Sequence, residues 1–189
     1  SVTAGGRISM FFCTPFDALG TTMATYAGQN TGAGELKRVK SGMYASCVIG
    51  FAYSALAFIV MILFGRQLSL LFVDSGQSAI LSQAHSFLVV NSSSYVLLTL
   101  VNVVRFTIQG MGFSKFAIYS GVFEMVARTL TGIFVVPACG FLGACFASPS
   151  AWLFADFFLV PAFYHCLKKL ELWEKTHNIR GGYDSRSRS

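Results

Sequence analysis

Charged residues are scarce in this chain and are absent from long stretches of it. Only 12% of the 189 residues are Asp, Glu, Lys or Arg, whereas 54% are hydrophobic. Soluble domains usually carry about twice that share of charge, so the composition argues against a soluble globular domain. Residues 43–64 contain no charged side chain. As a helix, such a stretch is long enough to cross a bilayer core of about 30 Å.

The motifs of covalent and metal chemistry are missing as well. None of the five cysteines forms a CxxC pair, and the three histidines are scattered, so no metal-ligand spacing emerges. No nucleophile with a neighbouring base can be argued, so we expect no enzyme activity and no cofactor. The net charge of +6 lies in connections and near the C-terminus, not along one stripe. This distribution argues against nucleic-acid binding.

Five apolar stretches predict five membrane-spanning helices, because a backbone in lipid must satisfy its own hydrogen bonds. They cover residues 8–29, 43–64, 85–108, 116–136 and 148–167. The chain is therefore expected to be an all-α membrane protein whose membrane part ends near residue 170, followed by a polar tail over 171–189. The chain opens with Ser1 and shows no signal-peptide pattern. We expect it to begin partway through a longer protein.

Positive residues are distributed unequally between the two sides of the expected membrane. The connections near residues 37–40 and 115, together with the tail, carry ten Lys and Arg residues, whereas the opposite side carries two. Because cytoplasmic loops are enriched in Lys and Arg, this asymmetry predicts a cytoplasmic C-terminus. The connection at residues 28–42 is expected to contain a cluster of three of these cations.

Five ionisable residues lie inside the apolar stretches, where each costs roughly 2.5–3.5 kcal/mol at mid-helix. They are Asp17, Arg105, Glu124, Arg128 and Asp156. Glu124 and Arg128 have the i,i+4 spacing of a helix ion pair, and Arg128 should lie at about the depth of Asp156. Our hypothesis is that Arg128 pairs with Glu124 or Asp156, while Arg105 is close enough to the cytoplasmic side to be able to extend there. Such charges either pin helices together or line a cavity for ions or a cationic solute.

The third apolar stretch has a polar face. The polar residues that follow helical spacing are Asn91, Tyr95, Thr99, Asn102 and Gln109. This face is expected to look into the bundle. It could line a wet cavity, or its side chains could hold neighbouring helices together by hydrogen bonds.

Several sequence motifs follow one another in a familiar order. Residues 14–42 read TPFDALGTTMATYAGQNTGAGELKRVKSG, in which a Pro-x-x-x-x-Gly run leads into GQN-x-GAG-x-x-x-R-x-x-x-G. The motif positions are Pro15, Gly20, Gly28, Gln29, Asn30, Gly32, Ala33, Gly34, Arg38 and Gly42. They are followed by LFVD at 71–74, VRFTIQGMG at 104–112, GVFEMVAR at 121–128 and GFLGACFASPSAWLFADFFLVPAFY at 140–164. This series resembles helices eight to twelve of multidrug and toxic compound extrusion (MATE) transporters.

The resemblance implies a partial C-terminal lobe, residues 1–170, of a twelve-helix transporter with two lobes around a central cavity. It implies export of organic cations in exchange for Na⁺ or H⁺ across a bacterial plasma membrane, by alternating access. The missing N-terminal lobe and membrane lipid would be its partners. Sodium-coupled members of the family have an acid midway along the tenth helix. Residues 91–104 contain none, and Leu98 occupies about that position, so we assign no cation ligand.

The candidate residues for cavity lining or gating are Tyr95, Asn102, Arg105, Glu124 and Arg128, with Asp17 and Asp156 as further candidates. A lipid-linked oligosaccharide flippase of the same superfamily is one alternative function. It would need several cations facing the cavity to hold pyrophosphate. A non-transporting structural membrane subunit is another alternative, and it predicts that the polar face of the third stretch is fully packed.

Overall fold

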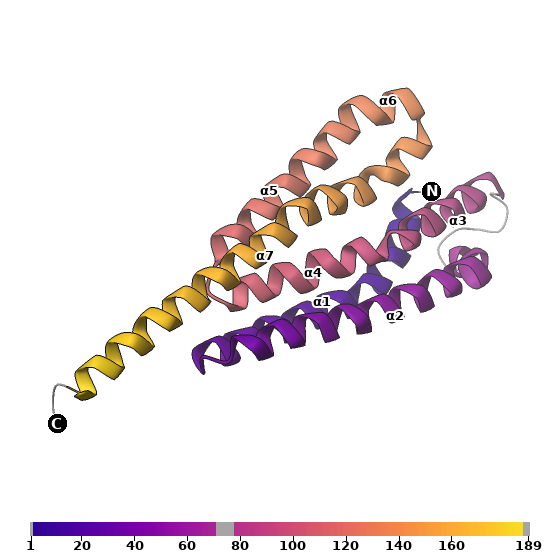
Figure 1. The fold of residues 1–189 in the computed structure, drawn as a ribbon. Helices are drawn as coiled ribbons and strands as arrows, with labels where there is room; N and C mark the ends of the chain where they lie inside the picture. Colours follow the sequence, from indigo (N-terminus) through magenta and orange to yellow (C-terminus); the bar gives the residue numbers. More distant parts are fainter. Residues whose placement is uncertain (1, 71–77, 187–189) are drawn as a thin grey trace.

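A computed structural model describes residues 2–70 and 78–186, and this part of the chain is helical except for short turns. The elements are α1 (Val2–Gly32), α2 (Leu36–Leu70), α3 (Ser78–Ser93), α4 (Tyr95–Gly110), α5 (Ser114–Leu130), the π-helix η1 (Thr131–Val135), α6 (Val136–Cys139) and α7 (Phe141–Arg186). Figure 1 shows them as long rods lying roughly side by side. The all-α membrane fold expected from the sequence is confirmed. Residues 71–77, which include the LFVD motif, lie outside the described residues.

The first connection is much shorter than the sequence suggested. Helix α1 ends at Gly32 and α2 begins at Leu36, so only three residues separate them. Gly34 has φ +73°, a left-handed conformation that favours glycine. The three cations expected in a loop therefore belong to the first turns of α2, which still places them at the end of the bundle. The prediction of a long loop over residues 28–42 was wrong, because its glycines cluster at one tight turn.

The third expected helix is two helices, bent by 49° between residues 81–93 and Tyr95–Gly110. The break is at Ser94, which has φ −100° and ψ 6°. Just before it, the hydroxyls of Ser92 and Ser93 donate to the carbonyl oxygens of Val89 and Val90 at 3.1 and 2.7 Å. Serine side chains that compete for backbone carbonyls weaken the helical ladder, so the serine run explains the bend.

The fourth expected helix continues past its predicted end at residue 136. After α5, one π-helical turn, η1, leads into the short α6, which contains Pro137. Because proline has no backbone N–H to donate and crowds the preceding turn, a wider turn before it accommodates the ring. The connection between α6 and α7 is the single residue Gly140, at φ +57°. The π-helical turn η1 approaches α7 closely there, and a Cβ on Gly143 would lie 2.7 Å from the carbonyl oxygen of Val135, the last residue of η1.

Helix α7 is far longer than the expected 148–167. It begins at Phe141, continues through Pro149 and Pro161, and reaches Arg186. The polar region after residue 170 is therefore a helical extension of α7 within the described residues, and it projects beyond the other helices (Figure 1).

Three helical stretches are long and apolar enough to cross a membrane: Leu36–Leu70, Ser114–Cys139 and Phe141–Thr176. The bent pair α3–α4 makes a fourth if it counts as one span. Helix α1 is not in this set, since its glycines, threonines and Asp17 lower its hydropathy. It has 31 residues and packs along α4 and α2, so a fifth crossing there stays a prediction.

The helices are arranged so that α7 lies between α5 and the group formed by α1, α2 and α4 (Figure 1). The α1–α2 turn, the α4–α5 turn and the extension of α7 lie at one end of the bundle. This grouping of connections is the one that the sequence predicted. The core contains buried apolar residues of α1, α2, α4 and α7. Helix α5 lies at its edge, where only Ser120 and Ala127 are buried.

Candidate functional site

Tyr95 lies at the centre of the bundle and is fully buried. Its hydroxyl is 3.0 Å from Ser9 Oγ on α1, and its ring packs against Phe16 and Trp152, with centroids 5.5 and 6.4 Å away. The contacts join α1, α4 and α7 in one aromatic cluster. In this conformation Tyr95 lines no open cavity, so its role in gating stays a prediction.

A second part of the polar face of α4 joins it to α2. Thr99 Oγ1 donates to the carbonyl oxygen of Tyr95 at 3.0 Å and lies 3.1 Å from Ser54 Oγ. The absence of a side chain on Gly50 leaves room for Thr99, because a Cβ there would overlap the Thr99 methyl group. This portion of the polar face therefore holds α4 against α2 by hydrogen bonding between the helices, which was one of the two interpretations left open by the sequence.

The charges of α4 and α5 form one network of three residues. Glu124 makes ion pairs with Arg105 on α4 and with Arg128 one turn along α5, the latter at 3.7 Å. Arg105 Nε also donates to Ser120 Oγ at 2.8 Å. The hypothesis that Arg128 pairs with Glu124 is confirmed. Arg105, which the sequence placed within reach of the cytoplasmic side, contacts a carboxylate across the α4–α5 interface, and a charged partner of this kind stabilises a guanidinium that is largely removed from solvent.

Burial differs across this network. The side chains of Glu124 and Arg105 are 15% and 22% exposed, whereas that of Arg128 is 50% exposed. Glu124 and Arg128 line a cavity of about 270 Å³ on the surface of α5. The network therefore extends from Arg105 and Glu124, which are largely buried, to Arg128 at the surface of the described helices.

Asp156 lies apart from the network, in the core. It is 6% exposed, and neither carboxylate oxygen has a hydrogen-bond partner among the described residues. No ion pair joins it to Arg128, so that alternative was wrong. Arg105 interacts with it electrostatically without an ion-pair contact. Asn102 is also 6% exposed, and its Nδ2 has no hydrogen-bond partner in the same part of the structure.

Asp17 is exposed on α1 and forms no ion pair within the described residues. The seven candidate residues therefore divide into an aromatic cluster at Tyr95, a charge network, an isolated core acid and the separate Asn102 and Asp17. Sequence reasoning missed Ser120 and Trp152. Each lies four residues before a candidate acid, so helical spacing could have identified both.

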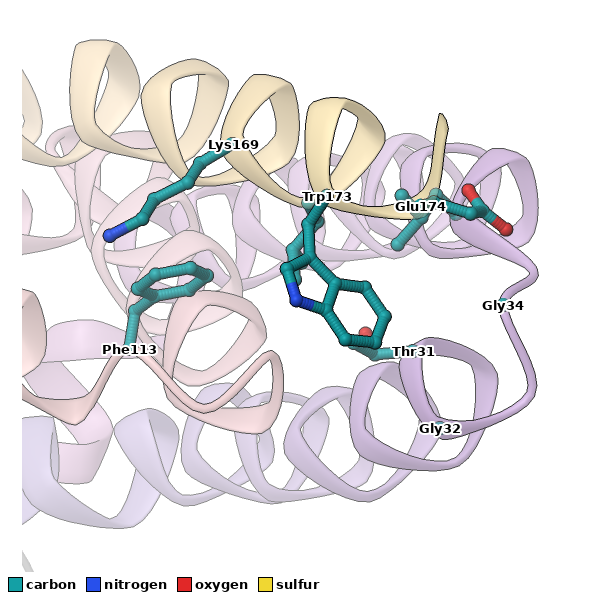
Figure 2. Close-up of a pocket in the computed structure, with 9 residues that line it drawn as sticks. Thr31, Gly32, Gly34, Phe113, Lys169, Trp173 and Glu174 are labelled. Atoms are coloured by element: carbon teal, nitrogen blue, oxygen red, sulfur yellow. The ribbon is translucent and has the colours of Figure 1, made fainter. Parts of the chain in front are cut away.

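A cavity lies at the end of the bundle that carries most cations. It has a volume of about 430 Å³ and is lined by residues of the α1–α2 turn, the α4–α5 turn and α7. Figure 2 shows Lys169 over the ring of Phe113, with Trp173 and Glu174 further along α7. The Lys169 Nζ atom is 5.6 Å from the Phe113 centroid. This cation–π contact joins α7 to the α4–α5 turn.

Within the described residues, no group of three or more His, Cys, Asp or Glu side chains is arranged to hold a metal ion. The arrangement instead has the features of a membrane protein that shelters a few charges between apolar helices. The sequence model of the MatE family matches residues 1–134.

The chain belongs to the MatE family. MatE proteins are transporters, so the chain is assigned to membrane transport in general terms. The matched region contains six of the seven candidate residues, and Asp156 lies beyond it. Comparisons with curated proteins and with solved structures gave no match.

Proposed function

We propose that this chain is part of the C-terminal lobe of a MatE transporter that exports organic cations in exchange for Na⁺ or H⁺. The observation that carries the proposal is the charge balance at membrane depth. Arg105 and Arg128 share one partner, Glu124. The carboxylate of Asp156 has no hydrogen-bond or ion-pair partner among the described residues. The interior therefore offers an acid to a cation, and both of its bases are already paired.

The same balance argues against the flippase alternative. A pyrophosphate carries several negative charges and needs cations that are free to contact it. Arg105 already contacts Glu124 between α4 and α5, and Arg128, which is half exposed on α5, pairs with the same acid. A structural subunit would have its interior polar groups paired, yet Asp156 and Asn102 each keep unpartnered buried atoms. These features favour a site that changes occupancy during transport.

The proposed setting is a bacterial plasma membrane, with the C-terminus in the cytoplasm. The support is that the end of the bundle carrying the α1–α2 turn, the α4–α5 turn and the extension of α7 has most of the Lys and Arg residues. Cytoplasmic loops carry such an excess. The second lobe of the transporter would face the surface formed by this chain.

The proposal is tested with the complete transporter that contains this chain, reconstituted in liposomes. A fluorescent organic cation is placed inside, and a Na⁺ or a pH gradient is imposed separately. We expect one of the gradients to drive efflux, and Asp156→Asn to reduce the rate at least tenfold. Transport of a labelled lipid-linked oligosaccharide, with no cation efflux under either gradient, would contradict the proposal and support the flippase.

A further inference from the structure

Two cavities border each other at the end of the bundle where α7 leaves the other helices. The first is the cavity of about 430 Å³ described above, and the second has a volume of about 520 Å³. They share Gly34, Leu36 and Glu174 as lining residues. Apolar side chains of the α4–α5 turn and α7 dominate the first cavity, whereas charged side chains dominate the second. The pair therefore has one apolar and one charged part, as an amphiphilic ligand does.

The charges that line the two cavities are balanced. Three are acids and three are lysines: Glu35, Glu171, Glu174, Lys37, Lys169 and Lys175. No ion pair joins any two of these six side chains in the described part of the chain. This end of the bundle as a whole has an excess of Lys and Arg, so the balance is a local property of the lining. It favours a ligand that carries both signs of charge over one with a net negative charge.

Glu174 lies where the two cavities meet. Its side chain is half-buried, and its Oε1 atom would lie 3.0 Å from a Cβ added to Gly34. Gly34 has φ +73° in the α1–α2 turn, a conformation that favours glycine. Figure 2 shows Glu174 on α7 beside this turn. The bare turn therefore leaves room for the carboxylate at the border between the apolar and the charged part.

The depth of the cavities corresponds to lipid headgroups. The last apolar stretch ends at residue 167, so Lys169 and Glu174 lie about 3 and 10 Å beyond it at a rise of about 1.5 Å per residue. The headgroup layer on each side of a bilayer is about 5–7 Å thick. Trp173 lies between these two positions, and tryptophan is enriched in this layer. The cavities thus begin inside the headgroup layer and reach its aqueous edge.

We propose that the two cavities together bind one phospholipid with a phosphoethanolamine headgroup. Its phosphate would contact Lys169 and Lys37, its ammonium would contact Glu174 and Glu171, and its glycerol end would occupy the apolar cavity. A primary ammonium donates hydrogen bonds to carboxylates, as a lysine does. A quaternary ammonium has no N–H to donate and is typically held by an aromatic cage.

The aromatic lining does not form such a cage. Phe113 already has Lys169 over its ring, with Nζ 5.6 Å from the centroid, so Trp173 is the aromatic ring left to the ligand in the described lining. A bound lipid of the proposed kind would join α7 to the α1–α2 turn through its two charges. The proposal does not rest on the transport function proposed above.

Lipid binding is measured on the full chain in detergent by native mass spectrometry. The probes are phosphatidylethanolamine, phosphatidylglycerol and phosphatidylcholine with identical acyl chains. We expect phosphatidylethanolamine to bind most tightly. Glu174→Gln should weaken its binding about tenfold, the effect of losing a hydrogen bond between charged groups. The variant should also lose the preference over phosphatidylglycerol, because its lining has a net positive charge.

The matched control is Lys168→Gln. Lys168 precedes Lys169 on α7 but lines neither cavity, so this variant should keep the affinity and the preference of the wild type. Lys169→Gln should weaken the binding of both phosphatidylethanolamine and phosphatidylglycerol, because each has a phosphate. Circular dichroism checks that the variants are folded. In liposomes, a phosphatidylethanolamine with a photoreactive group near its glycerol should crosslink to Leu36, Phe113 or Leu170.

Three results would overturn the inference. One is equal affinity for the three lipids. Another is a wild-type preference for phosphatidylglycerol, which would indicate a general attraction of the cationic end for anionic lipid. The third is unchanged binding of phosphatidylethanolamine in folded Glu174→Gln and Lys169→Gln. Because none of these measurements involves transport, failure of the lipid site and failure of the proposed function can be distinguished.

Discussion

The two ion pairs of Glu124 should differ greatly in strength, and this difference can be measured. Glu124 contacts Arg105 across the α4–α5 interface and Arg128 along its own helix. The perturbation is a pair of double-mutant cycles that combine Glu124→Gln with Arg105→Gln or with Arg128→Gln. Glutamine keeps most of the side-chain volume, so each cycle isolates the charge interaction rather than the packing.

The magnitudes follow from burial. Removing one partner of a fully buried pair costs about 3–5 kcal/mol, whereas an exposed i,i+4 pair contributes about 0.3–0.5 kcal/mol. The Arg105 and Glu124 side chains are 22% and 15% exposed, so this pair is largely but not fully buried. We expect a coupling free energy of about 2 kcal/mol for Arg105–Glu124. For Arg128, whose side chain is 50% exposed, we expect less than about 0.5 kcal/mol.

The assay is the free energy of unfolding of the chain in mixed detergent micelles, followed by circular dichroism during a denaturing-detergent titration. The single variant Glu124→Gln should be the least stable of the three, because it leaves the Arg105 charge with only Ser120 as a partner. Equal coupling energies in the two cycles, or a larger one for Arg128, would refute the assignment of Arg105 as the principal partner.

Three further outcomes are expected. Gly110→Ala should lower the free energy of unfolding by about 1–3 kcal/mol, because its Cβ would press on the backbone of α1. Gly121→Ala is the matched control, since nothing lies within 4 Å of the added atom. The control substitution should be neutral or stabilising. Thr131→Ala should lose about 0.6 kcal/mol in the same measurement, since Thr131 Oγ1 lies 3.1 Å from Ser150 Oγ on α7, while the exposed Thr129→Ala should change it less. Expression of these 189 residues alone in an efflux-deficient host should leave drug sensitivity unchanged, and resistance would contradict the need for a second lobe.

The existence of the helices and the order of the connections could be predicted from the sequence, because both depend on local properties. Long apolar runs require helices in lipid. Successive connections must then lie on opposite sides of the membrane, because each run crosses it once. Boundaries were less predictable. The first turn is shorter and α7 longer than expected, since polar helix ends at a membrane surface carry no apolar signal. The bend at Ser94 was also missed, although the serine run before it was visible.

The pairing of Glu124 with Arg128 was predictable because both residues lie on one helix, where spacing fixes their separation. The pairing of Glu124 with Arg105 was not. Contacts between helices depend on how each helix is rotated about its axis and tilted against its neighbours, and the sequence pattern does not determine these angles. For the same reason the isolation of Asp156 became evident only in the folded chain.

The sequence by itself determined that this chain is a helical membrane protein with its cations gathered at one end and a few acids and bases at membrane depth. The length of an apolar stretch and the distribution of charge depend on residues that are neighbours in the sequence, so both can be predicted before the tertiary structure is known. Only the tertiary structure decided which of those charges neutralise one another. The pairing depends on distances between side chains of different helices. In the folded chain Arg105 and Arg128 both pair with Glu124, whereas the Asp156 carboxyl has no partner among the described residues.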